Sequence, residues 1–208
     1  WYNLVSAFGG LYAVEPNRGV FVRIDADGRV TRVADMIARV ASIDPAGNGD
    51  KTFSALAVRG CWFYFGTLGR IDTGFEGAVY RLHKDTLAIE RVATGLHGVL
   101  GLAFDRRGRL HALETTAAGV EPPLSDPTAG RLVRIERDGS LTPVVTNLAF
   151  PTALLAGRRG ELYVSNCGYH CDDRSAFPAT LPSLRSGQIL KVVTRYGGAA
   201  PPGPAGRG

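Results

Sequence analysis

Apolar residues are arranged along this chain in short runs rich in Val, Leu, Ile, Tyr and Phe, and Gly, Asp or Pro bounds the runs. Runs of this composition between turn-forming residues are typical of β-strands. No segment keeps apolar residues at a sustained helical spacing. We therefore predict an all-β fold.

Two of these runs recur four times, which indicates a repeat protein. The first recurs at Gly10–Glu15, Gly60–Gly66, Gly108–Glu114 and Gly160–Asn166. The second follows each copy, at Gly19–Ile24, Gly77–Leu82, Gly130–Ile135 and Gly187–Val192. The basic residues Arg23, Arg81, Arg134 and Lys191 of the second run are 58, 53 and 57 positions apart. The chain is therefore predicted to contain four units of about 50 to 60 residues.

Each unit has the pattern of an antiparallel meander of strands a, b, c and d, in which the two recurring runs are b and c. Strand a is predicted at Leu4–Phe8, Phe53–Val58, Val99–Phe104 and Ala153–Ala156. Strand d is visible in three units, at Val30–Val33, Ala88–Val92 and Leu141–Val145. Asp27-Gly28 and Asp138-Gly139 fit tight turns between c and d, and Gly108 fits the turn between a and b of its unit.

Strands such as Leu11–Val14 are apolar at consecutive positions, so both faces of each sheet must be buried. Blades stacked around a channel achieve this, and the repeat length suits a β-propeller better than a two-layer sandwich. We predict blades at 1–40, 41–97, 98–149 and 150–194, and a disordered Gly/Pro-rich tail at 195–208. The last unit lacks strand d, so we expect a piece of a larger, six-bladed ring.

Composition excludes several classes of protein. Of 208 residues, 45% are hydrophobic and 21% charged, which excludes a disordered chain. The net charge of +5 comes mainly from arginines scattered among acidic residues, so nucleic-acid binding is not expected. No apolar run approaches the ~20 residues of a membrane-spanning helix, so no membrane span is predicted.

Several stretches together resemble the ScyD/ScyE family of propeller proteins. They are Leu11–Asn17 with Val22–Gly28, Gly98–Leu110, Gly130–Ile135 with Asp138-Gly139, and Leu162–Asn166 with Gly187–Lys191. NHL-type and lactonase-type propellers share the general pattern. The resemblance implies a propeller that is exported to an extracellular or periplasmic location. It also implies a secretion signal and further blades ahead of the matched part in the full-length protein.

The predicted topology brings the ends of strands b and the starts of strands a to one rim of the ring. The ligand-binding rim is therefore predicted to consist of Asn3, Glu15, Ser54, Thr67, Glu114, Thr152 and Asn166. Glu15, Glu114 and Asn166 are candidate oxygen ligands for Ca²⁺. Alternatively, these three side chains accept hydrogen bonds from amides of the b–c loops. The starts of strands a provide no acidic residue that would favour the metal.

The cysteines and histidines form no established motif. Cys167 and Cys171 are predicted to form a local disulfide in an exported protein, with zinc binding together with His170 as the alternative. Cys61 precedes Trp62 in an apolar run and is expected to be a buried thiol. His111 takes the place of an aromatic residue in the repeat, so it is expected to pack within its blade.

The functional prediction is an exported propeller that binds a small molecule or a partner protein at the loop-bearing rim. Three long loops there, Leu68–Glu76, Ala117–Ala129 and Gly168–Ser186, favour recognition. The alternative is a metal-dependent hydrolase or lyase acting at the channel mouth. The sequence leaves open whether the protein is an enzyme and what its oligomeric state is.

Overall fold

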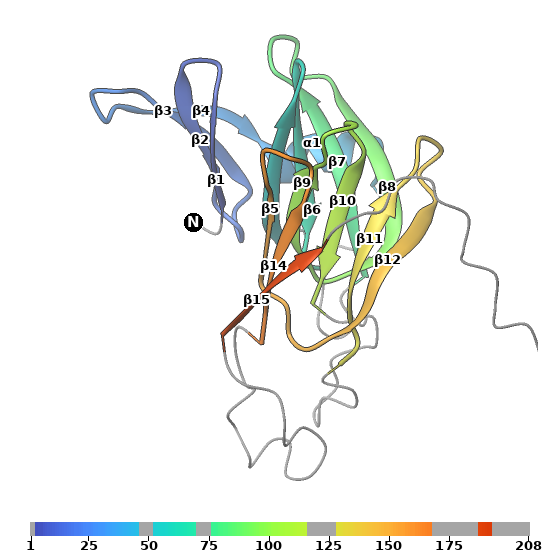
Figure 1. Cartoon of the computed structure of the whole chain (residues 1–208). Helices are drawn as coiled ribbons and strands as arrows, with labels where there is room; N and C mark the ends of the chain where they lie inside the picture. Colours follow the sequence, from blue (N-terminus) through green and yellow to red (C-terminus); the bar gives the residue numbers. More distant parts are fainter. Residues whose placement is uncertain (1–2, 46–51, 70–75, 116–127, 168–186, 193–208) are drawn as a thin grey trace, which may run out of the picture.

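The structure, a computed structural model, describes residues 3–45, 52–69, 76–115, 128–167 and 187–192. Within these residues, three antiparallel sheets have four strands and one has three, and in every sheet the strand order follows the chain. The sheets succeed one another around a common centre as four blades of a β-propeller (Figure 1). The predicted meander and fold class are confirmed.

The strand bounds follow the repeat closely. Blade 1 consists of β1 (Asn3–Ala7), β2 (Gly10–Val14), β3 (Val20–Ile24) and β4 (Val30–Asp35). Blade 2 consists of β5 (Phe53–Arg59), β6 (Trp62–Thr67), β7 (Glu76–His83) and β8 (Ile89–His97). Blade 3 consists of β9 (Val99–Phe104), β10 (Leu110–Glu114), β11 (Gly130–Ile135) and β12 (Leu141–Leu148). Blade 4 has β13 (Ala153–Ala156), β14 (Leu162–Asn166) and β15 (Gln188–Val192).

The first strand of each blade is the inner one, since β1 contacts β5, β5 contacts β9, and β9 contacts β13. Apolar side chains fill the three spaces between blades. Phe21 and Phe65 pack between blades 1 and 2, Val99 packs between blades 2 and 3, and Leu113 packs between blades 3 and 4. Both faces of blades 2 and 3 are therefore buried, as the consecutive apolar positions require.

Aromatic rings dominate the space between blades 1 and 2. The ring centroids of Phe21 and Phe65 lie 5.0 Å apart at 87°, and those of Phe21 and Phe63 lie 4.8 Å apart at 72°. Edge-to-face pairs of this kind add about 1 kcal/mol each beyond the burial of their area. This cluster fixes blade 1 against blade 2.

One helix, α1 (Met36–Ile43), follows blade 1 and was not predicted. Asp35 caps it, since its carboxylate accepts a hydrogen bond from the Ala38 amide at 3.0 Å. Met36 and Val40, one turn apart, are both fully buried in the space between blades 1 and 2. The helix is too short to produce a sustained period in the sequence.

The turns follow the predicted chemistry. Gly28 and Gly139 have φ of 82° and 85°, in the left-handed region that glycine adopts without strain.

The expectation for Cys61 is wrong: its thiol is free and exposed, because Gly60 and Cys61 form the turn between β5 and β6 rather than part of a strand. The predicted tail at 195–208 lies outside the described residues. No helix among the described residues is long and apolar enough to cross a membrane.

Candidate functional site

The ends of the second strands carry four side chains that the repeat makes equivalent: Glu15, Thr67, Glu114 and Asn166. The Glu15 carboxylate accepts hydrogen bonds from the backbone amides of Asn17 and Arg18, both in the β2–β3 loop. The Thr67 hydroxyl accepts a hydrogen bond from the Ala78 amide on β7 at 2.9 Å. In blades 1 and 2, therefore, the side chain at the end of the second strand accepts hydrogen bonds from backbone amides that follow it in the same blade.

Glu114 and Asn166 accept hydrogen bonds from backbone amides that precede their own blade. Glu114 is fully buried and accepts from the His97 amide at 2.7 Å and from Nε of Arg131 at 2.6 Å. Asn166 accepts from the Ala149 amide at 2.8 Å. Both amides belong to the segment that enters from the preceding blade, so these two side chains join consecutive blades.

The candidate calcium ligands thus have protein donors on their oxygen atoms. Among the described residues there is no group of three or more His, Cys, Asp or Glu side chains that could hold a metal ion. Glu15 has the loop-amide contacts of the alternative interpretation, whereas Glu114 takes an amide from the interblade segment and a guanidinium from β11. Calcium binding at Glu15, Glu114 and Asn166 stays a prediction.

The starts of the inner strands differ from blade to blade. Ser54 is buried and its hydroxyl donates to the carbonyl of Val99. Asn3 and Thr152, in contrast, line one pocket of about 630 Å³, here called the channel-side pocket. The structure therefore brings together two of the seven predicted rim residues in this pocket, and the other five do not line it.

The walls of the channel-side pocket are mainly apolar. Leu100 comes from blade 3, and blade 4 contributes Leu155 and Ile189, whose exposed fractions are 68% and 70%. The hydroxyl of Thr152 donates to Oγ of Ser165 at 3.2 Å, which places two hydroxyls side by side in the lining. No charged side chain is among the described residues that line this pocket.

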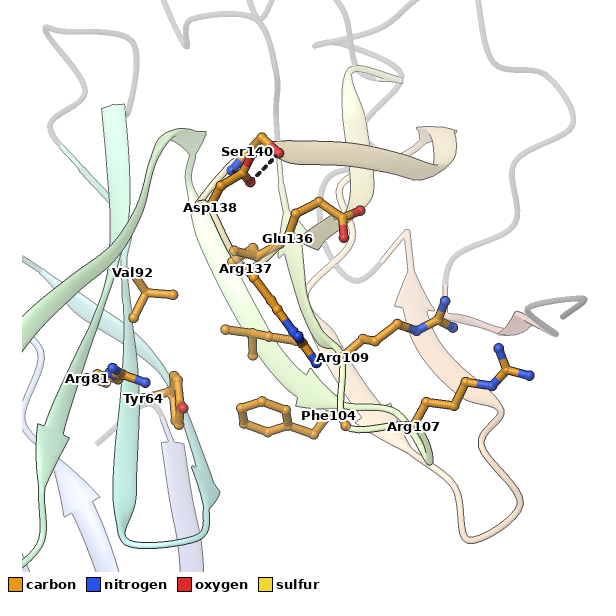
Figure 2. Close-up of a pocket in the computed structure, with 13 residues that line it drawn as sticks. Tyr64, Arg81, Val92, Phe104, Arg107, Arg109, Glu136, Arg137, Asp138 and Ser140 are labelled. Atoms are coloured by element: carbon orange, nitrogen blue, oxygen red, sulfur yellow. Dashed lines mark hydrogen bonds between the residues drawn. The ribbon is translucent and has the colours of Figure 1, made fainter. Parts of the chain in front are cut away.

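A second pocket, of about 780 Å³, was not predicted. It lies between blades 2 and 3 and is here called the interblade pocket (Figure 2). Blade 2 contributes Tyr64, Arg81 and Val92, and blade 3 contributes its β9–β10 and β11–β12 turns. The sequence carries part of the signal, because the β9–β10 turn is rich in arginine and the β11–β12 turn contains Arg137, but only the fold shows that the two turns line one pocket.

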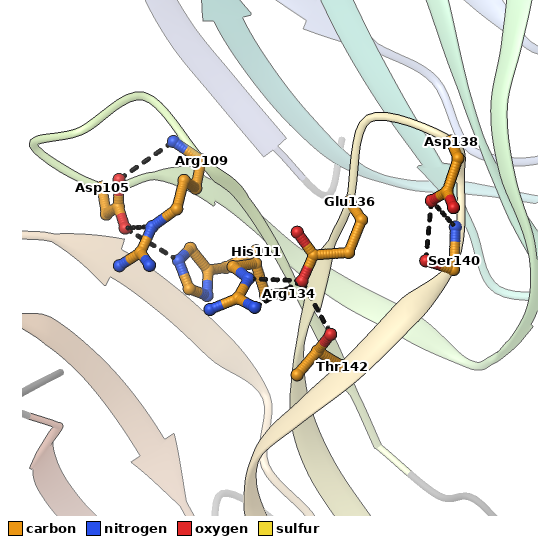
Figure 3. Close-up of polar contacts among 8 residues, drawn as sticks. All are labelled: Asp105, Arg109, His111, Arg134, Glu136, Asp138, Ser140 and Thr142. Carbon is orange, nitrogen blue, oxygen red and sulfur yellow. Dashed lines mark hydrogen bonds and ion pairs between the residues drawn. The ribbon is translucent and has the colours of Figure 1, made fainter. Parts of the chain in front are cut away.

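A buried polar network supports the β9–β10 turn (Figure 3). Asp105 accepts from the amides of Arg107 and Arg109, both at 2.9 Å, and from Nε of Arg109 at 2.7 Å. It also contacts Nε2 of His111 at 3.2 Å. An ionised carboxylate only accepts, so Nε2 of His111 carries the proton and Nδ1 is left as an acceptor. That Nδ1 is buried and has no hydrogen-bond partner among the described residues.

The environment of this network lowers the pKa of both Asp105 and His111. Burial alone raises the pKa of Asp105, but the hydrogen bonds from Arg109 and His111 outweigh it and lower this pKa to about 2. Burial lowers the pKa of His111 against the opposing effect of Asp105. The site at neutral pH is therefore an ionised Asp105 beside a neutral His111, which agrees with the expected packing role of that histidine.

Gly108 is the position where this turn needs glycine. Its φ is 76°, and an added Cβ would collide with the Arg59 guanidinium, which stacks on the Phe104 ring with its Cζ 5.2 Å from the centroid. We expect Gly108→Ala to lower the free energy of unfolding by about 2 kcal/mol in urea denaturation.

The control is Gly28→Ala, in the β3–β4 turn of blade 1, where φ is 82° and nothing lies within 4 Å of the added Cβ. It carries only the backbone strain, so it should cost about 1 kcal/mol. Equal losses for the two variants would show that the Arg59 contact contributes nothing.

Cys167, which follows β14, is disulfide-bonded, and the structure shows Cys61 free. Cys171 and His170 lie outside the described residues, so the predicted pairing of Cys167 with Cys171 stays a prediction. Most of the three long loops expected to carry recognition also lies outside the described residues.

No family model matches the chain, and no curated protein matches it. Among solved structures the chain is similar to streptogramin B lyase, with a TM-score of 0.54 and 12% identity over 91% of this chain and 53% of the lyase. It is similar to the PQQ-bound aldose sugar dehydrogenase of Streptomyces coelicolor, with a TM-score of 0.59 and 16% identity over 81% of this chain and 56% of the enzyme.

A third similar structure is the extracellular domain of a protein described as a hybrid two component system of B. thetaiotaomicron. Its TM-score is 0.53, with 13% identity over 79% of this chain and 20% of that one. At these identities the likeness shows the β-propeller fold alone. The chain spans about half the length of the lyase and the dehydrogenase. The ScyD/ScyE resemblance stays a prediction.

Proposed function

We propose that this chain is a ligand-binding propeller, and that the channel-side pocket takes a small, neutral, mainly apolar molecule. One observation carries the proposal: side chains of three blades, among them Asn3, Leu100 and Thr152, converge on a single pocket. Pockets that hold small molecules are mostly apolar with a few convergent polar groups.

The lining selects the chemistry of the ligand. Leu100, Leu155 and Ile189 offer apolar area, and burying such area is worth about 25 cal/mol per Å². Asn3 and the hydroxyls of Thr152 and Ser165 supply the hydrogen-bonding groups. Because the described part of the lining holds no charge, it offers an ion that enters the pocket no compensation for lost hydration.

The predicted alternative, a metal-dependent hydrolase or lyase, needs Glu15, Glu114 and Asn166 to hold a metal. Glu114 already forms an ion pair with Arg131, and Asn166 accepts from the Ala149 amide. These contacts favour a binding protein over metal chemistry at the channel mouth. No described constellation favours a reaction type.

Export belongs to the same proposal. A disulfide at Cys167 suits an oxidising compartment, and one of the similar structures is an extracellular domain. Both features support the extracellular or periplasmic location expected from the sequence.

Leu155→Glu tests the pocket, because it places a charge on the apolar wall at a position that is already 68% exposed. The probe is 2-naphthalenemethanol, a neutral aromatic alcohol, and its binding is measured by isothermal titration calorimetry. We expect affinity at least tenfold weaker than for the unchanged protein.

Val30→Glu is the matched control, an exposed valine on β4 that does not line the pocket. It should leave the affinity unchanged. The proposal fails if the probe does not bind, if Leu155→Glu binds it as well as the unchanged protein, or if both variants weaken it equally.

A further inference from the structure

The interblade pocket differs from the channel-side pocket in its charge. Four arginines and two acidic residues are among the side chains that line it: Arg81, Arg107, Arg109, Arg137, Glu136 and Asp138. All the described residues that line the pocket belong to blades 2 and 3. The pocket is therefore separate from the channel-side pocket, on which the proposed function rests.

The two acidic residues are already bound. Glu136 accepts from Nε of Arg134 at 2.6 Å and from the Thr142 hydroxyl at 2.7 Å, and these bonds lower its pKa (Figure 3). Asp138 accepts from both the amide and the hydroxyl of Ser140. Both carboxylates are thus held by residues of their own β11–β12 hairpin, and the lining keeps an excess of positive charge.

Arg137 is the arginine best placed to receive a ligand. Its side chain extends from the β11–β12 turn toward Phe104 (Figure 2). It has no hydrogen bond or ion pair with any residue in the part of the chain that the structure describes. A guanidinium in this position presents its paired N–H donors to a carboxylate or phosphate, with which it forms two parallel hydrogen bonds.

The blade 2 wall adds a second, more rigid cation. The Arg81 guanidinium lies 4.4 Å from the Trp62 ring centroid and donates through Nε to Glu90 at 2.8 Å. Burial opposes its charge, but the hydrogen bonds to Glu90 and Tyr64 raise the pKa of Arg81 above its usual range. Arg81 therefore stays charged beside the Tyr64 hydroxyl.

The floor of the pocket is apolar and aromatic. Tyr64 and Phe104 meet edge to face with ring centroids 4.9 Å apart, and Leu110 and Ile135 complete the surface. An inorganic ion would leave this surface uncovered. A molecule with one anionic group and an apolar body would satisfy both parts of the lining.

From these contacts we infer that the interblade pocket is a second binding site, for a small organic anion. Arg137 holds the anionic group, Arg81 and Tyr64 flank it, and the apolar body lies against Phe104, Leu110 and Ile135. A carboxylate and a phosphate ester share this chemistry, and the test separates them.

The probes are 2-naphthoate, 2-naphthyl phosphate and the neutral 2-naphthalenemethanol, each titrated calorimetrically into the protein and its variants. Arg137→Gln should weaken the better-bound anion at least tenfold and leave the affinity for the neutral alcohol unchanged. The ratio of the two anions' affinities identifies the preferred group. Leu155→Glu should not affect the binding of either anion, which separates this site from the channel-side pocket.

Arg106→Gln is the control, since Arg106 is an exposed arginine of the β9–β10 turn that does not line the pocket. It removes the same charge a short distance away and should change anion affinity less than twofold. Three results would overturn the inference: no anion binding, binding that Arg137→Gln leaves intact, or an equal loss in Arg106→Gln, which indicates non-specific attraction. Circular dichroism verifies that each variant folds.

Discussion

Glu114→Gln is expected to lower the free energy of unfolding by about 3 kcal/mol, because it breaks an ion pair whose acidic partner is fully buried. One carboxylate oxygen of Glu114 accepts from the His97 amide and the other from Nε of Arg131. A glutamine has only one accepting oxygen, so its amide nitrogen must face one of these two donors. Urea denaturation at pH 7 measures the loss.

The matched control is Glu76→Gln, an exposed glutamate on β7, which should change stability by no more than about 0.5 kcal/mol. The double variant Glu114→Gln with Arg131→Gln should be more stable than the sum of the single losses predicts, because the two residues interact. A loss below 1 kcal/mol for Glu114→Gln would contradict the structural role.

The same variant separates this role from the calcium prediction. If Glu114 only joins blades 2 and 3, adding Ca²⁺ raises the unfolding midpoint of neither the unchanged protein nor the variant. A calcium-dependent rise that Glu114→Gln abolishes would instead support the metal site, since a ligand that binds only the folded state stabilises it.

The fold could be predicted because the repeated sequence pattern has a direct physical explanation. Consecutive apolar positions such as those of β6 require burial on both faces, and a stack of blades provides that for blades 2 and 3. Helix α1 could not be found in this way. It depends on a cap at Asp35 and on two buried residues, and this pattern is too short to stand out from a strand.

The sequence predicts which side chains lie at the ends of strands, but it does not predict which groups those side chains contact. The topology placed Glu114 and Asn166 at equivalent positions, but the choice of partner depends on register and on how the preceding blade enters. The interblade pocket combines turns that lie about thirty residues apart, and their contact follows from the twist and packing of blade 3. Cys61 was misplaced because a turn of one glycine and one apolar residue looks like a strand.

Asp105→Asn should lower the free energy of unfolding by about 2 kcal/mol at pH 7, and the loss should shrink in acid. The carboxylate accepts two backbone amides and the Arg109 side chain, and these bonds hold its pKa at about 2 in the folded protein against 3.8 as the ordinary value. The unfolded chain therefore takes up the proton first. The stabilisation is complete above pH 4 and is lost as the pH falls through 2.

The size follows from the shift, since one pKa unit corresponds to about 1.4 kcal/mol. Asp25→Asn is the control, because Asp25 begins the β3–β4 turn of blade 1, which has the same backbone hydrogen bonds as the Asp105 turn, but pairs with a partly exposed Arg23 at 2.9 Å. Its effect should stay below about 1 kcal/mol. The measurement is urea denaturation of the three proteins at pH 7, 5 and 3.

His111 gives the unchanged protein a second dependence on acid, which is coupled to Asp105 because this carboxylate raises the pKa of His111 against the effect of burial. Its pKa is lowered by burial, so the unfolded chain is protonated first and stability falls as the pH drops below about 6.5. This loss begins near pH 6.5, where Asp105 is still ionised in both states. A difference between the unchanged protein and Asp105→Asn that stays constant from pH 7 to 3 would show that Asp105 does not hold its charge through the turn. If the difference closes only below pH 4, Asp105 is the group that holds Arg109 and His111 in place.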